Sequence, residues 1–192
     1  MKLMDIYNQS ILTERYVNLF GPELKQHIDV IWDMLQKAYA SLDGGFATAR
    51  TKEELIKKTW LTKCVRRNGK IVACKLYADK LGRKSIAGAT DGSAEGKAGF
   101  YKMIEEDFRL KRAWGEVSGK MEHINAKQGA IPIPNIYAAK LTGKPILSLN
   151  PDGIHYTREI GGEPHEKVIM AWDGFIKDTL GENKFGKLKK SL

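Results

Sequence analysis

Cysteine and histidine are scarce in this sequence of 192 residues, which contains two cysteines, Cys64 and Cys74, and four histidines. The histidines are scattered and no Cys-x-x-Cys pair exists, so no zinc site is expected. The two thiols are expected to be reduced and partly buried. Without a dense disulfide framework, the chain must rely on a hydrophobic core, for which its length is sufficient.

Long hydrophobic runs are also missing. No stretch approaches the roughly 20 apolar residues that a membrane span requires. The N-terminal residues 1–6 have an early acid and no apolar run, so they do not resemble a secretory signal. The sequence therefore predicts a soluble, cytoplasmic protein without a membrane partner, and its 42% hydrophobic and 29% charged residues are typical of a globular chain.

Acidic residues are outnumbered by basic ones, and the formal net charge is +9. Such a balance favours anionic partners, among them nucleic acid, acidic proteins and phosphorylated cofactors. Four lysines fall within the seven residues 184–190, which are expected to form a solvated terminus. An arm that binds nucleic acid is the alternative interpretation.

Hydrophobic periodicity predicts two helices before the main strands. Pro22 opens the first, apolar residues recur at steps of three and four after it, and Gly44-Gly45 should end it. A capping box formed by Thr51 and Glu54 predicts a short second helix to about Lys58. Residues 1–20 are weakly patterned and are interpreted as a short strand or an arm.

Three antiparallel strands should follow, over residues 61–66, 71–77 and 84–90. Asn68-Gly69 separates the first two and is the strongest short hairpin signal, because both turn positions need a positive φ. The small residues of segment 91–99 then lead into a helix that carries Phe100. A strand over 113–118 comes next and lies parallel to the third strand if the helix is a crossover.

The rest of the chain should hold a helix over 120–128 and two strands, over 154–160 and 167–172, joined by a loop over 161–164. The predicted fold class is α/β, with a mixed, mostly antiparallel sheet and one β-α-β crossover. Neighbouring strands tend to part where such a crossover interrupts a sheet, and a ligand can enter there. Three parts are expected: an N-terminal arm over 1–21, a domain over 22–174, and a C-terminal helix with a basic tail over 175–192.

The first candidate site is the glycine-rich loop from Gly92 to Gly96. A helix N-terminus offers free N–H groups and the positive end of its dipole, and glycine lets the backbone approach a phosphate. Lys97 adds a cation, although Ala98 after it breaks the spacing of a P-loop. The alternative is a flexible turn, which the acids Asp91 and Glu95 favour because they repel an anion.

The second candidate is Glu116 with Ser118, two residues apart on one face of the strand that follows the crossover helix. A carboxylate there can act as a general base for an amine, and the serine can position it. The alternative is a solvent-facing alternation of polar groups. His123 and Asn125 in the next helix are a third candidate. Side chains interpreted as packing or surface groups include two tyrosines and three core tryptophans: Tyr101, Tyr137, Trp60, Trp114 and Trp172.

This order of elements resembles the GCN5-related N-acetyltransferase superfamily over about residues 22–172. In that family two helices precede an antiparallel meander, and a strand leads through a pyrophosphate-binding loop into a helix. A splayed fifth strand, a helix and a terminal hairpin follow. The family's loop reads Gln/Arg-x-x-Gly-x-Gly/Ala. Gly96-Lys97-Ala98 matches its second half, Ser93 stands in place of Gln or Arg, and Asn125 stands where a tyrosine often protonates the leaving thiolate.

The resemblance implies an N-acyltransferase that transfers an acyl group from acetyl-CoA or another acyl-CoA to an amine of a small molecule or a macromolecule. It implies that Glu116, Ser118 and Asn125 lie at the reaction, with Glu116 taking a proton. It also implies that the donor is held at the end of the third strand and in the loop after it, by Ala89, Thr90, Ser93, Gly96, Lys97 and Ala98.

Two alternatives stay open. One is an enzyme that modifies nucleic acid on the same fold, which also occurs in a phage enzyme that modifies DNA adenine. Its phosphate contacts would come from the tail and from a basic hairpin that contains Lys63, Arg66, Arg67 and Lys70. The other is a binding protein that kept the fold without the chemistry. The sequence does not indicate an oligomeric state.

Overall fold

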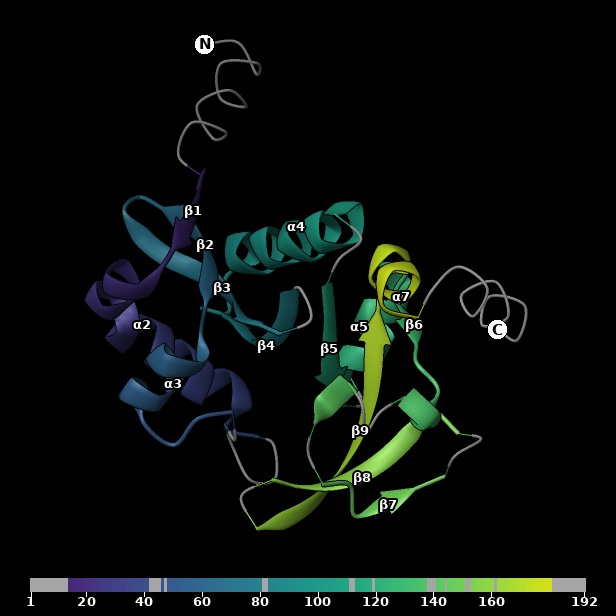
Figure 1. Cartoon of the computed structure of the whole chain (residues 1–192). Coiled ribbons are helices and arrows are strands. Elements are labelled where there is room, and N and C mark those ends of the chain that lie inside the picture. The colour runs from purple at the N-terminus through teal and green to yellow at the C-terminus, as the bar shows by residue number, and fades with distance from the viewer. Residues whose placement is uncertain are drawn as a thin grey trace. The chain divides into compact units, whose positions relative to one another are not determined.

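The computed structural model describes residues 14–41, 46, 48–80, 83–110, 113–118, 120–137, 141–143, 145–150, 153–160 and 162–180. Gly44-Gly45 and the lysine-rich segment 184–190 lie outside these ranges. The chain forms two compact units, Met1–Ala78 with Ile86–Met103 and Asp79–Ser85 with Ile104–Leu192. Strand β4 (Arg83–Thr90) and helix α4 (Ala94–Leu110) each run from one unit into the other (Figure 1).

The first unit contains a sheet with helices on both faces. Its strand order is β1-β2-β3-β4, and β2 pairs antiparallel with both β1 and β3. Helices α2 and α3 pack on the face that carries Cys64, while the start of α4 packs on the opposite face against Val65. The segment expected to be a strand or an arm therefore includes a strand. The elements introduced here are β1 (Glu14–Leu19), α2 (Gly21–Tyr39), α3 (Lys52–Lys58), β2 (Leu61–Arg67) and β3 (Lys70–Asp79).

Both predicted helices of this unit are confirmed, and local sequence explains them. Pro22 lies in the first turn of α2, where its missing N–H costs nothing. The apolar stripe of α2 is buried, with Leu24, Ile31 and Leu35 at most 1% exposed. At α3, the Thr51 hydroxyl accepts a hydrogen bond from the Glu54 amide at 3.1 Å, which is the predicted cap.

The predicted hairpin between β2 and β3 is confirmed. Asn68 and Gly69 both adopt a positive φ, of 49° and 78°, as a tight two-residue turn requires. The register of the two strands sets Cys64 directly opposite Cys74. Both thiols are free and fully buried.

The second unit contains the parallel crossover. The first residues of β4 pair with β5 (Ala113–Val117) in parallel, from Arg83 opposite Ala113 to Ser85 opposite Gly115. This pairing confirms the predicted β-α-β unit, and the strand order continues β5-β9-β8-β7. The other elements are α5 (Lys120–Lys127), β6 (Ile131–Pro132), η1 (Asn135–Tyr137), β7 (Ser148–Leu149), β8 (His155–Ile160), β9 (Glu163–Ala171) and α7 (Asp173–Leu180).

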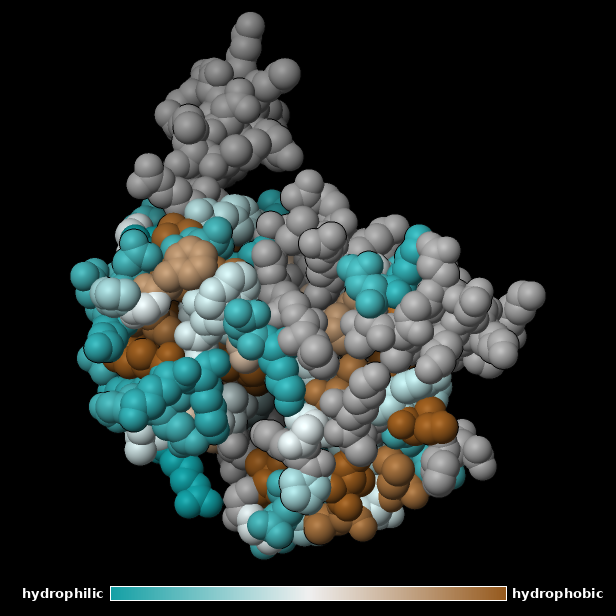
Figure 2. All heavy atoms as spheres, viewed as in Figure 1, coloured by the Kyte–Doolittle hydropathy of each residue, from teal (hydrophilic) through white to brown (hydrophobic). Residues whose placement is uncertain are grey.

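An apolar core closes one end of the second unit. Trp114 of β5 is fully buried and stacks on Phe175 of α7, with ring centroids 5.5 Å apart. Ile169 and Ala171 of β9 complete the same cluster. Hydrophobic residues also reach the surface near β7 and β8 (Figure 2), where Leu147 is 58% exposed. Within the described ranges, no helix is long and apolar enough to cross a bilayer.

Three details of the sequence prediction were wrong. Helix α4 begins at Ala94, so most of the segment 91–99 is helical. Strand β9 begins at Glu163, because Gly162 adopts a φ of +97° and turns the chain at once, so the loop expected over 161–164 is shorter. Trp60 is 44% exposed and packs edge-on against Phe20, so it is not a core residue. Trp114 and Trp172 are buried as predicted.

Candidate functional site

The candidate loop lies in the first unit and forms a self-contained helix cap. Ser93 immediately precedes α4, and its hydroxyl accepts a hydrogen bond from the Gly96 amide at 2.9 Å. Asp91 Oδ1 in turn accepts from the Ser93 amide at 2.9 Å and from the Ser93 hydroxyl at 2.5 Å. The Gly92 amide donates to the Thr90 hydroxyl at 3.2 Å. Side chains of the loop thus satisfy three of its own N–H groups.

Gly96 is required for close packing in addition to any role in binding. A Cβ at this position would lie 2.5 Å from Asp91 Oδ1 and 2.5 Å from the Val72 carbonyl oxygen. Real Cβ atoms do not approach backbone atoms so closely. The first turn of α4 therefore sits against β3 at a distance that only glycine permits.

These contacts determine how the loop fits a pyrophosphate. Asp91 already places a carboxylate at the positive end of α4, where an external anion would bind. A pyrophosphate would have to displace Asp91 and Ser93 from the amides that they occupy, so it can bind at this loop only if the cap opens. Lys97 and Ala98, also predicted to hold the donor, are exposed on the first turns of α4, whereas Ala89 is buried in β4.

Glu116 lies in the second unit at the centre of a buried charged network. Its Oε1 accepts a hydrogen bond from Lys84 Nζ at 2.6 Å, and its Oε2 accepts from the Tyr156 hydroxyl at 3.2 Å. Arg158 Nη1 is 2.9 Å from Oε2, an ion pair without hydrogen-bond geometry. The side chains of Glu116, Lys84 and Arg158 are only 8%, 10% and 13% exposed. Two hydrogen-bond donors and one further cation therefore stabilise the carboxylate in its charged form.

Burial shifts the proton affinities of the groups around Glu116. Desolvation lowers the pKa of Lys84, although the nearby Glu116 carboxylate opposes that shift. Desolvation also lowers the pKa of Lys167, and the charge of Arg158 adds to it. Burial, followed by the negative charge of Glu116, raises the pKa of Tyr156. Tyr156 therefore acts as a hydrogen-bond donor and not as a base.

The other predicted catalytic residues, Ser118 and Asn125, also lie in the second unit. Ser118 directly follows β5 and is half-buried, and its carbonyl oxygen accepts from the Met121 amide at the start of α5. Asn125 is 6% exposed within α5, and its carbonyl oxygen accepts from the Ala130 amide where that helix ends. His123 is exposed on the same helix. The roles assigned to these residues stay predictions.

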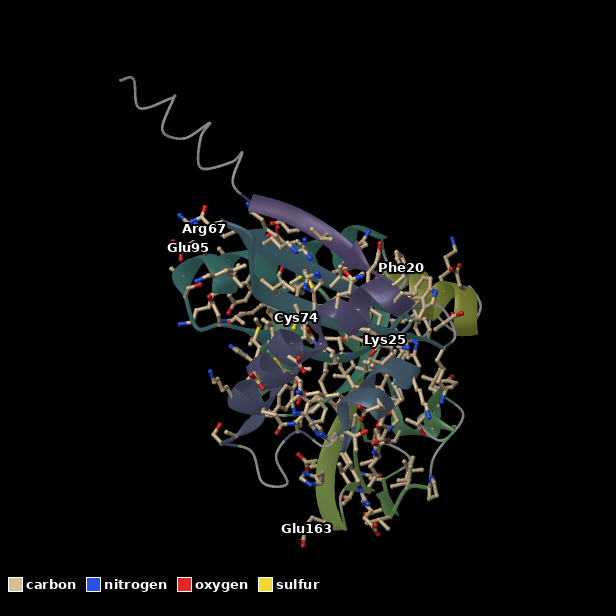
Figure 3. The ribbon with its side chains drawn as sticks, turned by 90° about the vertical axis from the view of Figure 1, so that its left-hand side faces the viewer. Phe20, Lys25, Arg67, Cys74, Glu95 and Glu163 are labelled. Atoms are coloured by element: carbon tan, nitrogen blue, oxygen red, sulfur yellow. The ribbon has the colours of Figure 1, made fainter. Side chains whose placement is uncertain are left out.

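The basic hairpin of the first unit is less available to phosphates than its sequence suggests. Lys63 is only 6% exposed. Arg67 forms an ion pair with Glu95 of α4, visible in Figure 3 where the two side chains lie together. Arg66 Nη2 lies 2.5 Å from His27 Nε2 of α2. Lys70, at the turn, is exposed.

Sequence reasoning missed the partners of Glu116, because they come from β4 and β8. Tyr156 and Arg158 occupy alternate positions on β8 and so share a face. This alternation is visible in the sequence, but the register that aligns β8 and β9 with β5 is not.

Comparison with known proteins was made by family models, by sequence and by structure. No protein-family model matches the chain, and no curated protein matches it by sequence. Among solved structures, it is similar to the ribosomal-protein-S18-alanine N-acetyltransferase from Escherichia coli. That structure has a TM-score of 0.51 and 14% identity, over 83% of this chain and 92% of the other.

An IAA acetyltransferase from Bacillus cereus ATCC 14579 is a more distant neighbour. It is 10% identical over 83% of this chain and 98% of its own, with a TM-score of 0.45. At 14% identity, the likeness to the Escherichia coli enzyme shows the fold alone. The chain has the fold of the GCN5-related N-acetyltransferase superfamily, as the resemblance in its element order predicted.

Proposed function

We propose that the chain is an N-acyltransferase that transfers an acyl group from a CoA thioester to an amine. The observation that carries the proposal is the fold shared with an acetyltransferase, together with the parallel pairing of β4 and β5. Fold alone does not define chemistry, so the reaction must be argued from the residues. The candidate base is Glu116, the carboxylate of the network in the second unit.

The reaction forms one bond, breaks one bond and moves protons at nitrogen and sulfur. The amine nitrogen bonds to the acyl carbon and loses a proton as it becomes an amide, while the carbon–sulfur bond breaks and the leaving thiolate takes up a proton. An acceptor that arrives as an ammonium ion must first lose a proton, and a carboxylate can take it directly or through one water. Because Lys84 and Tyr156 donate to Glu116 in the described state, the acceptor must displace one of these donors or act through water.

Donor binding is proposed to be in competition with the loop's own cap. Asp91 neutralises the N-terminus of α4 that a pyrophosphate would use. We therefore expect weak CoA affinity in the wild type. Asp91→Asn, which removes the internal charge but keeps a hydrogen-bond acceptor, should bind CoA more tightly.

Calorimetric titration of the full chain with CoA tests the donor. Lys97→Glu should weaken CoA affinity about tenfold or more, because it replaces an exposed cation beside the proposed phosphate position with an anion. Lys57→Glu is the matched control, since Lys57 is exposed on α3. Gly96→Asp is a poor test, because any Cβ there disturbs packing. Equal affinity in wild type and Lys97→Glu would show that the loop is only a turn.

Release of CoA thiol from acetyl-CoA and other thioesters, measured over a library of amines, tests the reaction. Transfer to at least one amine supports the proposal. A DNA base as the only acceptor would favour the nucleic-acid-modifying alternative. Neither CoA binding nor transfer to any amine or base would favour a binding protein.

A further inference from the structure

The face of the second unit's sheet that carries Glu116 holds more positive than negative charge. Three cationic side chains share this face with Glu116: Lys84 and Arg158, which pair with its carboxylate, and Lys167, which lies directly opposite Tyr156. Among the described residues of β8 and β9, Glu163 adds a second carboxylate to this face, at its exposed end. Buried charges are normally paired, so such an excess is unusual.

Several buried nitrogen atoms of this face have no hydrogen-bond partner within the described part of the chain. Arg158 Nε and Nη1 are buried without one, and so is Nε2 of His165. The register of β8 and β9 sets Arg158 directly opposite His165, and Tyr156 directly opposite Lys167. Directly opposite residues share a face, so these groups are neighbours. Unsatisfied buried groups in a native protein call for an explanation, and a role in binding or catalysis is one of those known.

Exposure rises along this face toward the hairpin that joins β8 and β9. Tyr156 is 2% exposed beside the core. Arg158, Lys167 and His165 are half-buried, and Glu163 at the end of β9 is exposed (Figure 3). An anion that approaches from the hairpin end would pass Glu163, reach His165 and Arg158 together, and then meet Lys167 one step deeper, beside Tyr156. This face is therefore open to solvent at the hairpin end and buried toward Tyr156.

We propose that Arg158, Lys167 and His165 form a binding site for an oxyanion, the carboxylate or phosphate group of the amine acceptor. The link to an acceptor rests on the proposed function, whereas the anion site itself does not. Glu116 would then have two roles toward the acceptor. Its carboxylate would balance the positive charge of the anion site, and it would lie nearest to the acceptor's amine. The acceptor class is an amine that carries an anionic group.

Thermal unfolding of the full chain tests the site without any acyl donor. Inorganic phosphate and succinate, each compared with sodium chloride at equal ionic strength, should raise the unfolding midpoint, because a ligand that binds only the folded state stabilises it. The stronger of the two identifies the anionic group. A rise no greater than that caused by sodium chloride would overturn the site.

Lys167→Gln is the decisive variant. No ion pair of Lys167 is recorded within the described part of the chain, so the variant should fold, yet it should weaken anion affinity about tenfold or more. Lys127→Gln makes the same charge change at an exposed position on α5 and should keep the wild-type affinity. Equal anion affinity in the two variants would contradict the assignment.

Matched acceptors test the link to acyl transfer. β-Alanine is compared with β-alaninamide, and phosphoethanolamine with ethanolamine. In one of the two pairs, the amine that carries an anionic group should have the lower KM. The Lys167→Gln variant should lose that difference in KM. Equal KM values within both pairs would overturn the acceptor assignment. Anion binding without transfer to any amine would support the site and refute the acyltransferase proposal.

Discussion

Glu116 neutralises cations that would otherwise be buried unpaired. Its 8% exposed carboxylate pairs with Lys84 and Arg158. Removal of one partner of a buried ion pair typically costs about 3–5 kcal/mol, because the opposite charge stays buried. We expect Glu116→Gln to lower the free energy of unfolding by about that amount in urea titrations. Glu122→Gln, which removes a more exposed partner of His155, should change it by less than about 0.5 kcal/mol.

A base role for Glu116 has a separate signature. If Glu116 takes the acceptor's proton, Glu116→Gln should lower kcat about 10²–10⁴-fold at temperatures where the variant is fully folded, with CoA affinity unchanged. Full turnover at saturating acceptor would place the base elsewhere. The two measurements are independent, since one reports folding and the other turnover.

The paired cysteines predict how stability depends on alkaline pH. Burial raises the pKa of Cys64 to about 12 and also raises that of Cys74. In the unfolded chain thiols lose their proton near about pH 8.5, so above this pH the unfolded state binds fewer protons and the folded state loses stability. Each thiol should contribute a loss of about 1.4 kcal/mol per pH unit.

Urea titrations between about pH 9 and 11 measure this loss. Lys84 and Lys167, whose pKa values are lowered, act in the opposite direction over part of this range. Comparison with Cys64→Ala cancels their contribution, and the variant should show a shallower decline. Parallel pH curves for wild type and variant would contradict the expected role of the thiol.

At the scale of single elements, α4 depends on the absence of a side chain at Gly96. A Cβ there would meet Asp91 and the backbone of Val72. Overpacking of this kind typically costs about 1–3 kcal/mol, even though alanine favours a helix. We expect Gly96→Ala to lower the unfolding midpoint and Lys97→Ala, at an exposed position of the same turn, to leave it nearly unchanged. An increase in the midpoint of Gly96→Ala would show that the turn relaxes.

Elements with strong local signals were predictable from the sequence, and elements set by register were not. The cap at Thr51 and the turn at Asn68-Gly69 need only a few adjacent residues, and both are confirmed. The start of α4 was misplaced because small residues in 91–99 suggested a loop, while Ser93 and Asp91 cap the helix early. The partners of Glu116 depend on long-range strand pairing, which local periodicity does not specify.

At the scale of the whole molecule, the net charge of +9 predicts weak, unspecific association with DNA. The hairpin adds little, because Lys63 is buried and Arg67 pairs with Glu95. Fluorescence anisotropy with two unrelated duplexes should give equal affinities that fall steeply between about 50 and 200 mM salt. Salt-resistant binding to one duplex, weakened by Lys70→Glu, would instead support the nucleic-acid alternative.

The interleaving of the two units has a consequence for synthesis on the ribosome. The first unit contains all its residues once Met103 has emerged, whereas residues 79–85 belong to a unit that ends much later in the chain. Domains begin to fold while the chain grows at about 5–20 residues per second. Because β4 starts at Arg83 and β5 at Ala113, the nascent chain holds the start of β4 without its β5 partner for about 1.5–6 seconds.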